Sequence, residues 1–331
     1  MDNDDFPILP SVLSGDTADV YFMRTRQVLE QTGLNPRAAM EFFPARDGLL
    51  CGMREAVSLL RRVLPPDAEV WGLEEGQAMS RKETILRVTA PYQSYGIYET
   101  ALAGFLAQES AWATAARECV DAATGVPVIS FGARHVHPNV AAVMDYAAVV
   151  GGCLSCSSVE GARLAGVAPS GTMPHALIIC FGDTVVAALA FDEHMPPEVT
   201  RTVLVDTFHD EAEESLRVAA AMNERLQSVR LDTPGERGGV TPDLVKEVRA
   251  RLDLAGFPWV QIFVSGGITP ERIVGMRQEG ARVDGYGVGS YITSAPPIDF
   301  TADIHEIDGR PVAKRGRLPG ITPNPRLKRL L

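Results

Sequence analysis

The chain has 331 residues, of which 46% are hydrophobic and 22% charged, a composition typical of a globular protein with one large domain or two unequal ones. Its net charge of −11 argues against a nucleic acid or an anionic membrane as partner, because either would need clustered Lys and Arg. The acidic start "MDNDDFPILP" does not resemble a signal peptide, and no apolar run reaches the roughly 18 residues of a membrane span. We therefore expect a cytoplasmic protein.

The first helix is predicted within "DTADVYFMRTRQVLEQTG", where apolar residues recur at helical spacing and Gly33 suits the end. The residues expected to supply much of its apolar face are Val20, Met23, Val28 and Leu29. Two strands should follow on either side of a turn at Glu75-Gly76, the second over 84–89. The alanine-rich stretch from Tyr98 to Ala123 predicts a long helix that crosses between two domains.

After Gly125, short apolar runs alternate with helical patterns. The runs are "VPVISFGAR", "RTVLVDTF", "QSVRLDTP", "WVQIFVSGG" and "VDGYGVGS". Alternating strands and helices predict a parallel sheet, and this many units favour a closed or nearly closed α/β barrel with its chemistry at the carboxyl ends of the strands. The tail "IDFTADIHEIDGRPVAKRGRLPG" predicts a hairpin around Asp308-Gly309 that pairs with the first domain. We expect a barrel domain over 121–295, and a first domain over 1–120 that 296–331 completes.

The five cysteines are odd in number and irregularly spaced, which predicts reduced thiols. Cys153 and Cys156 form one CxxC, but no second pair of ligands accompanies it, as a structural zinc site would need. We expect small residues in a tight loop there, rather than a redox or metal site.

Two glycine-bearing turns follow the last two predicted strands. "FVSGGITPERI" holds Ser265, Gly266 and Gly267 before a helix that opens at Thr269 or Pro270, and "DGYGVGS" holds Gly287, Gly289 and Ser290. Glycines let a phosphate approach backbone N–H groups, and a helix N-terminus adds partial positive charge. Any turn can require glycine, but a pair of such turns at this place predicts a phosphorylated ligand.

Charged residues follow the earlier strands. Arg134 follows the first barrel strand, where an arginine can bind a carboxylate or phosphate or simply face solvent. Asp206 and Asp232 each end an apolar strand; together they could hold Mg²⁺, bind ribose hydroxyls or stabilise a cationic transition state, and either alone could merely cap the next helix. Arg230, two residues before Asp232, should point to the same side of its strand.

The stretch "GVAPSGTMPHALI" contains one histidine, His175. Its residues alone leave three interpretations open: a packed core residue, a general base, or a residue that carries a group during a reaction.

Several of these stretches together resemble the nicotinate phosphoribosyltransferase family, in its compact archaeal and bacterial forms. They are "SGDTADVYFMRT", "ETILRVTAPY", "YETALAGFLAQES", "SFGARHVHP", "GGCLSCSSVEGARLAGVAPSGTMPHAL", "VLVDTF", "VRLDTP", "IFVSGGI" and "DGYGVGSYI". The similarity covers roughly residues 12–317. It implies an irregular seven-stranded α/β barrel, plus an α/β sandwich domain formed by the N-terminal region and the C-terminal strands.

The resemblance also implies a reaction. Phosphoribose would pass from phosphoribosyl pyrophosphate to nicotinate, with Mg²⁺ as cofactor and ATP as co-substrate, in NAD biosynthesis. His175 would accept a phosphoryl group from ATP, at the start of a helix near Pro174. Asp206 and Asp232 would lie by the ribose and its Mg²⁺, as the other catalytic residues.

The remaining roles follow from the same resemblance. The expected substrate-binding residues are Tyr21, Arg134, Ser157, Thr172 and Arg230. The expected binders of the 5′-phosphate are Ser265, Gly266, Gly267, Gly287, Gly289 and Ser290. Tyr21 would reach the base from a neighbouring subunit, so we expect a homodimer or higher homo-oligomer with shared sites.

The sequence departs from the family pattern in two places. His135 stands where the family commonly has a second arginine, which leaves an altered base specificity open. The tail "RLPGITPNPRLKRLL" has no cysteine for a zinc knuckle, so we expect no structural zinc. Quinolinate phosphoribosyltransferase and a non-catalytic phosphosugar-binding paralogue are the alternatives.

Overall fold

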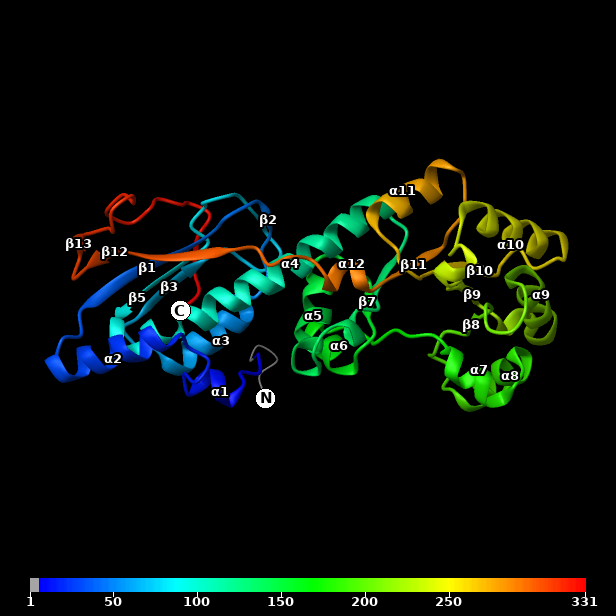
Figure 1. The fold of residues 1–331 in the computed structure, drawn as a ribbon, viewed down its shortest axis with the longest axis horizontal. Coiled ribbons are helices and arrows are strands. Elements are labelled where there is room, and N and C mark those ends of the chain that lie inside the picture. The colour runs from blue at the N-terminus through cyan, green and yellow to red at the C-terminus, as the bar shows by residue number, and fades with distance from the viewer. Residues whose placement is uncertain (1–5) are drawn as a thin grey trace. The chain divides into compact units, whose positions relative to one another are not determined.

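The computed structural model describes residues 6–331, which form two compact units (Figure 1). One unit extends to Thr114 and resumes over Ala295–Leu331; the other is Ala115–Ser294. Helix α4, Glu99–Ala123, contributes to both, and its bounds confirm the predicted long helix. The other elements of the first unit are α1 Pro10–Leu13, α2 Val20–Thr32, β1 Arg37–Pro44, β2 Gly48–Leu49, α3 Met53–Val63, β3 Glu69–Gly72, β4 Ala78–Met79, β5 Leu86–Pro91, β12 Phe300–Ile307, β13 Arg310–Pro311 and β14 Lys328–Arg329.

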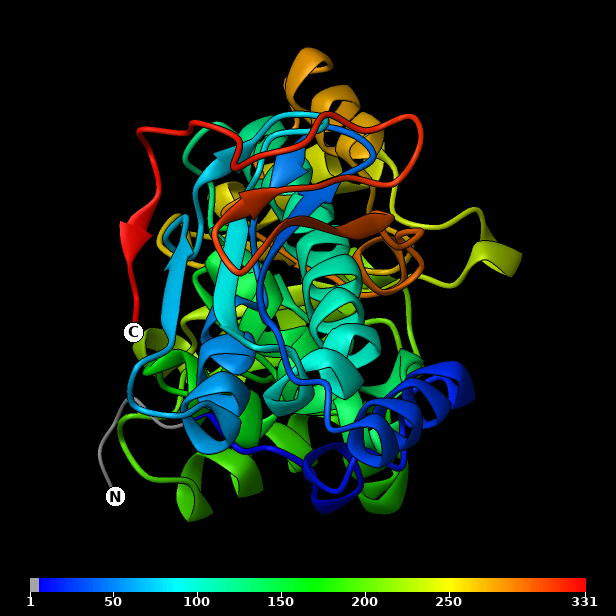
Figure 2. The same ribbon diagram turned by 90° about the vertical axis from the view of Figure 1, so that its left-hand side faces the viewer.

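The first unit is built on an antiparallel sheet in which both ends of the chain take part. Its strand order is β13-β12-β1-β5-β3-β14, and the pair β1–β12 joins residues more than 250 positions apart. Figure 2 shows the orange and red C-terminal strands among the blue and cyan N-terminal ones. The hairpin β12–β13 turns at Asp308-Gly309, both at positive φ, as the tail sequence predicts.

Alternation along the strands explains how this sheet is covered. Strand β5 alternates buried and half-buried residues, which is the pattern of a sheet with one face against the core. Helix α3 packs its apolar side, with Leu59 and Leu60 fully buried, into the same core as Phe42 and Val88. Its strong amphipathicity is that of a helix lying on a sheet.

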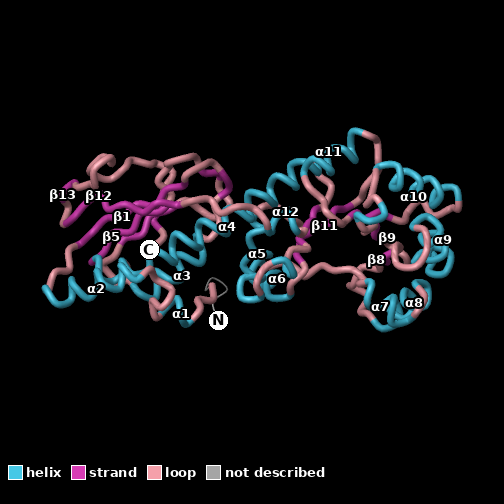
Figure 3. The backbone as a smooth tube through the Cα atoms, in the orientation of Figure 1, coloured by secondary structure: helices cyan, strands magenta, loops and turns pink. Residues whose placement is uncertain are grey.

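The second unit is a parallel sheet surrounded by helices (Figure 3). Its elements after α4 are β6 Val128–Ser130, α5 Pro138–Val150, β7 Ser155–Cys156, α6 Val159–Ala165, α7 His175–Phe181, α8 Thr184–His194, β8 Thr202–Leu204, α9 Glu211–Met222, β9 Ser228–Leu231, α10 Pro242–Leu254, β10 Gln261–Val264, α11 Pro270–Gln278, β11 Gly285–Val288 and α12 Ser290–Thr293. All five strands expected from the apolar runs are present, and the α/β fold class is confirmed.

The parallel sheet curls but its ends stay apart. Its order is β7-β6-β11-β10-β9-β8, and among the described residues β7 and β8 are not hydrogen-bonded to each other. The ladder therefore has six strands where the family resemblance implied seven. The chain between β7 and β8 is helical or irregular throughout, so it supplies no further strand.

Two local expectations differ from the structure. The predicted apolar face of α2 is wrong in part, since Val20 and Val28 are exposed while Phe22 is buried. Phe22 and Leu29 lie two turns apart, and that side of the helix faces the core. The CxxC is not simply a loop, because Ser155–Cys156 forms the edge strand β7 and both of its cysteines are buried.

In the part of the chain that the structure describes, no single helix is long and apolar enough to cross a membrane. Helices α7 and α8 pass that test only as a pair, and they are bent by 108° at their junction.

Candidate active site

The carboxyl ends of four strands, β6, β9, β10 and β11, meet around a cavity of about 240 Å³ in the second unit. Its lining residues are Phe131, Arg134, His135, Arg230, Asp232, Ser265, Gly266, Gly267, Gly287, Gly289 and Ser290. All six residues predicted to bind phosphate are in this set. Their separation in the sequence is bridged because parallel strands place their carboxyl ends on one edge of the sheet.

The first glycine turn requires its glycines. Gly266 and Gly267 have φ of +85° and +62°, a left-handed conformation that L-residues with side chains rarely adopt. The turn ends at Thr269, whose hydroxyl accepts from Arg272 N, and α11 then opens at Pro270 as the sequence predicts. The turn therefore presents backbone close to the cavity at the start of a helix.

The second glycine turn is required by close packing. A Cβ at Gly287 would lie 2.4 Å from the Phe131 ring, and one at Gly289 would lie 2.8 Å from the His135 ring. Both glycines thus allow side chains of the β6 end to approach the β11 end. Sequence reasoning missed Phe131, which carries no charge and reads as part of an ordinary strand end.

Arg272 is a second residue that the sequence did not reveal. From α11 its guanidinium donates to the carbonyl oxygens of Gly266 at 2.6 Å, Gly267 at 2.8 Å and Val240 at 2.8 Å. These bonds fix the glycine turn through its carbonyl oxygens and do not use its N–H groups. The signal that could have found it is an arginine in the first turn of the helix that follows a Gly-Gly turn.

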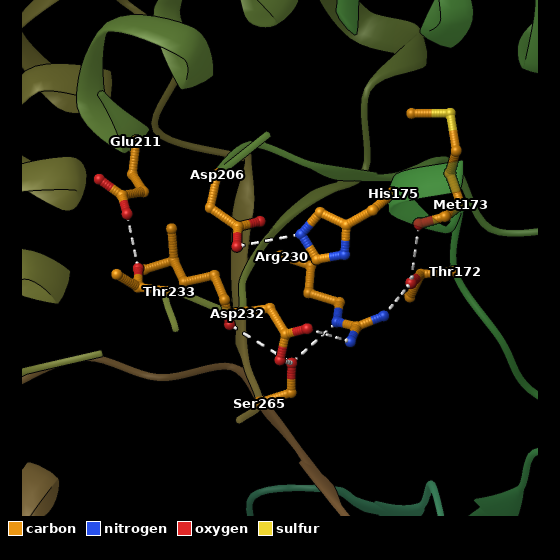
Figure 4. A network of polar contacts seen from close by, with 10 residues as sticks. Thr172, Met173, His175, Asp206, Glu211, Arg230, Asp232, Thr233 and Ser265 are labelled. Carbon is orange, nitrogen blue, oxygen red and sulfur yellow. Dashed lines mark hydrogen bonds and ion pairs between the residues drawn. The ribbon is translucent and has the colours of Figure 1, made fainter. Parts of the chain in front are cut away.

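Arg230 is the centre of the polar network in Figure 4. Its Nε donates to Ser265 Oγ at 2.8 Å, its Nη1 to Thr172 Oγ1 at 2.7 Å, and its Nη2 to Asp232 Oδ2 at 3.0 Å. Ser265 Oγ in turn donates to Asp232 Oδ1 at 2.7 Å. The predicted alignment of Arg230 with Asp232 is confirmed.

The surroundings of Arg230 restrict its chemistry further. Its guanidinium lies 5.1 Å from the centroid of the Phe131 ring, a cation–π arrangement. Burial lowers its pKa, and the two nearby aspartates, Asp232 and Asp206, partly oppose that shift. With three partners already bound, Arg230 holds the site together and has few free N–H groups for a substrate.

His175 and Asp206 form a second polar pair beside this network (Figure 4). His175 is the first residue of α7, after Pro174, as the resemblance implied. Its Nε2 lies 3.1 Å from Asp206 Oδ2, and its side chain is 40% exposed against 1% for Asp206. The packed-core interpretation of His175 is therefore wrong.

Asp206 is held in an unusual state for a carboxylate. Burial raises its pKa, and the neighbouring His175 opposes that rise. Among residues 6–331, no hydrogen-bond partner reaches its buried Oδ1. The helix-cap interpretation of the two aspartates is also wrong, because Asp210 caps α9 and Thr241 caps α10.

Arg134 and His135 lie on the short 3₁₀ turn Ala133–His135 after β6. Both are exposed and line the cavity, and Arg134 makes no ion pair with any described residue. A free guanidinium at the mouth of a cavity suits the capture of an anion. His135 contributes the second cavity-lining side chain of that turn.

Two expected substrate-binding residues lie elsewhere. Ser157 is exposed after β7 and does not line the cavity. Tyr21 lies on α2 in the first unit, where its hydroxyl donates to Asp19 at 3.2 Å. The roles expected for both stay predictions.

Comparison with known proteins gives the family. Models of the C-terminal and N-terminal domains of quinolinate phosphoribosyl transferase match residues 112–303 and 19–110. The chain belongs to the quinolinate phosphoribosyl transferase family. A solved nicotinate-nucleotide pyrophosphorylase from Pyrococcus furiosus is 42% identical, with a TM-score of 0.88 over 96% of this chain and 81% of that one.

Other relatives of this chain are named nicotinate phosphoribosyltransferase, the family that the sequence resembles. Nicotinate phosphoribosyltransferase pncB2 of Mycobacterium tuberculosis is 31% identical over 73% of this chain and 52% of the relative. A nicotinate phosphoribosyltransferase of Bacillus subtilis is 28% identical over 68% of this chain and 46% of the relative. The chain thus spans about half the length of the curated relatives it matches. Human nicotinic acid phosphoribosyltransferase, at 21% identity and a TM-score of 0.73 over 92% of this chain and 77% of that one, shares the fold.

Proposed function

We propose that this chain is a nicotinate phosphoribosyltransferase, a cytoplasmic enzyme of NAD biosynthesis that couples the transfer to ATP hydrolysis. The observation that carries the proposal is the pairing of His175 with Asp206 beside a glycine-lined cavity that holds an acidic and a basic network. The glycine turns can bind the phosphate of a phosphosugar. Binding alone would not require an exposed imidazole held by a carboxylate, so His175 favours a chemical step as well.

The cationic groups of the cavity favour a base with one carboxylate. Among the described lining residues, Arg134 is the one arginine without an ion-pair partner, and Arg230 already binds Asp232. Nicotinate carries one carboxylate, which Arg134 would bind. Quinolinate carries two on adjacent ring atoms and would require a second free cation besides those that hold the phosphates.

In the transfer step, the ring nitrogen of nicotinate would form a bond to C1 of the ribose as the bond from C1 to the pyrophosphate oxygen breaks. Positive charge develops on the sugar in between, and preorganised carboxylates stabilise it most effectively where water is excluded. Asp232 is preorganised by Arg230 and Ser265, and Asp206 by His175.

The donor set also fits Mg²⁺. The buried Asp206 Oδ1 has no hydrogen-bond partner among the described residues, and carboxylate oxygen is the ligand this ion prefers. Asp206 and Asp232 would hold the ion together with substrate oxygens. When bound, it would supply neutralising charge for the departing pyrophosphate.

His175 would serve as the nucleophile towards ATP. With Nε2–H donated to Asp206, the unprotonated Nδ1 is the nitrogen that can attack. The new bond joins Nδ1 to the γ-phosphorus as the bond from phosphorus to the ADP oxygen breaks. Water later attacks that phosphorus and releases inorganic phosphate, which regenerates the imidazole.

The first experiment compares bases. Purified protein is mixed with phosphoribosyl pyrophosphate, Mg²⁺ and nicotinate, nicotinamide or quinolinate, each with and without ATP, and mononucleotide is measured by chromatography. Turnover with nicotinate that ATP accelerates is the expected result. Turnover of quinolinate with release of CO₂ would assign the quinolinate activity instead. If no base gives a product, the remaining interpretation is a non-catalytic phosphosugar-binding protein.

The second experiment tests the phosphohistidine. Incubation with γ-labelled ATP should leave acid-labile label on the wild type and none on His175→Ala. Persistence of the label in that variant would refute the assignment. His209→Ala, which alters an exposed histidine after β8, serves as the matched control and should keep the label.

A further inference from the structure

A cysteine and three glutamates converge at the start of α3, in the first unit. Cys51 precedes Gly52, the N-cap of α3; Glu55 lies in its first turn; Glu75 follows β3; and Glu109 lies on α4. The sulfur of Cys51 and one carboxylate oxygen each of Glu75 and Glu109 all lie within 4.8 Å of one another. None of these residues has a role in the proposed reaction.

Glu109 supplies the observation that points to a ligand. It is only 2% exposed, and no hydrogen-bond donor among the described residues reaches its Oε1. That oxygen is directed to the cluster, because a Cβ at Gly52 would lie 3.1 Å from it. Gly52 N donates to Glu75 Oε1 at 2.8 Å and Arg54 N donates to Glu75 Oε2 at 3.0 Å, so Glu75 is fixed at the start of α3 beside Glu109. A buried acceptor without a donor is costly unless a cation binds it or the neighbouring Glu55 carboxyl shares a proton with it.

The spacing of the donors suits a small, borderline-soft cation. Zinc bonds of about 2.3 Å to sulfur and about 2.1 Å to oxygen, at a tetrahedral angle, place the two ligand atoms about 3.6 Å apart. Cys51 Sγ and Glu109 Oε2 are 3.6 Å apart; without a metal, the thiol donates a hydrogen bond to the carboxylate at this distance. One thiolate among carboxylates is also a donor set that distinguishes zinc-type metals from Mg²⁺ or Ca²⁺, which take oxygen alone.

We propose that Cys51, Glu75 and Glu109 bind one divalent metal ion of the zinc type, with Glu55 beside Glu109. The ion would join the start of α3 to the middle of α4, a structural role apart from the phosphoribosyl site. The chain's lack of a cysteine-rich tail led us to expect no structural zinc, but this cluster uses a single cysteine and has no ligand spacing that sequence reasoning could find.

The protonation of these groups favours an alternative without a metal. Burial raises the pKa of the Cys51 thiol and of the Glu109 carboxyl well above their usual ranges, and raises that of Glu55 to about 7. The rival interpretation is a proton shared between Glu55 and Glu109, with no metal.

An ion has a route to this cluster. Glu75 is only half-buried and lines a surface cavity of about 250 Å³, together with Arg54, Glu74 and Leu330. The buried cluster is thus connected to solvent through the side chain of Glu75.

Cobalt(II) is the probe for the test, because its thiolate complexes give a charge-transfer band in the near ultraviolet. Full-length protein is stripped with a chelator and titrated with Co²⁺, then with Zn²⁺ to displace it. The expected result is one equivalent of Co²⁺ per chain, the thiolate band, and a Tm that rises with metal. Cys51→Ser should abolish the band, and Glu109→Gln should weaken binding by more than the roughly tenfold to hundredfold typical of losing an outer-shell partner.

Matched controls are Cys180→Ser, at an exposed cysteine, and Glu74→Gln, at the exposed neighbour of Glu75. Both should keep the band and the affinity. A wild type that folds yet shows no thiolate band and no stoichiometric binding would overturn the proposal in favour of the shared proton. So would a band that survives in Cys51→Ser. If Glu109→Gln fails to fold, Cys51→Ser still decides between the two.

Discussion

Arg134 and Arg230 line the same cavity, but one is free among the described residues and the other is bound on three sides. We expect Arg134→Ala to lower kcat/KM for nicotinate by about tenfold to a hundredfold, the loss of one charged hydrogen bond of about 1.5–3 kcal/mol, with Tm unchanged. Steady-state kinetics with nicotinate as the varied substrate measures it. An unchanged KM for nicotinate would contradict the assignment of Arg134 to the base.

Arg230→Ala should behave in the opposite way. It leaves Asp232 without its guanidinium partner, so we expect a loss of about 3 kcal/mol in the free energy of unfolding, together with low activity. Urea unfolding followed by circular dichroism checks this. If Arg230→Ala is as stable as Arg134→Ala, then Arg230 is not the group that holds the network.

Asp206 should show a conflict between stability and function. Its folded-state pKa lies above that of an unfolded aspartate, so the native state binds this proton more tightly than the unfolded chain. The ionised form thus costs native stability above the folded pKa, and the cost vanishes below the ordinary aspartate pKa of about 3.9. We expect Asp206→Asn to have a higher Tm than wild type at neutral pH, with a gain that shrinks as pH falls.

The same substitution should lower ATP-accelerated turnover by at least about a hundredfold, because the imidazole loses the carboxylate that orients it. Melting curves from pH 4 to pH 8 measure the difference in Tm, and steady-state kinetics with nicotinate, with and without ATP, measure the turnover. A Tm gain that grew towards acid pH would mean that the sign of the Asp206 shift is wrong.

At the scale of an element, α11 carries both the helix start that faces the cavity and the arginine that fixes the glycine turn. Arg272→Ala removes three hydrogen bonds to carbonyl oxygens of Val240, Gly266 and Gly267. We expect a higher KM for phosphoribosyl pyrophosphate, by about tenfold, and a loss of about 1–3 kcal/mol in stability. Arg277→Ala, at an exposed position of the same helix, is the control and should change neither quantity. Equal KM values in the two variants would argue against a phosphate at this turn.

Element patterns in the sequence were sufficient for the parallel sheet, because each buried strand is a short apolar run and each crossover helix is amphipathic. They were insufficient for α2, where Val20 and Val28 fit a helical face that points outwards while Phe22 faces the core. They also missed β7, a strand so short that the small residues around Cys156 read as a loop.

Within the site, the sequence was sufficient to predict the charged, histidine and glycine residues. It was insufficient for the residues that hold them in place. Residue type and position near a strand end or helix start were enough to predict His175, Asp206, Asp232 and the glycines. Phe131 and Arg272 act through a ring face and through backbone carbonyls, which depend on the neighbouring strand rather than on local sequence. Such partners become visible only when the sheet order is known.

At the scale of the whole molecule, the exposed Tyr21 on α2 is the residue that we expect a neighbouring subunit to supply to the site. Tyr21→Ala and His175→Ala should each lose activity. If sites are shared across a dimer, mixing the two after unfolding and refolding should restore about a quarter of wild-type activity, because half of the dimers are mixed and each has one intact site. Activity that does not return in the mixture would place Tyr21 outside the site or within its own subunit's site.

The pairing of β12 with β1 has a consequence for how the protein is made. Strand β1 leaves the ribosome early, but the strand that completes its hydrogen bonding is about 260 residues further along the chain. At a synthesis rate of about 5–20 residues per second, that edge stays unpaired for roughly 13–50 s. The parallel sheet has all its strands by Val288, before β12 emerges. Newborn chains therefore spend most of translation with the β1 edge unpaired, and the parallel sheet is complete before that edge is covered, so chaperones have an exposed strand to protect throughout.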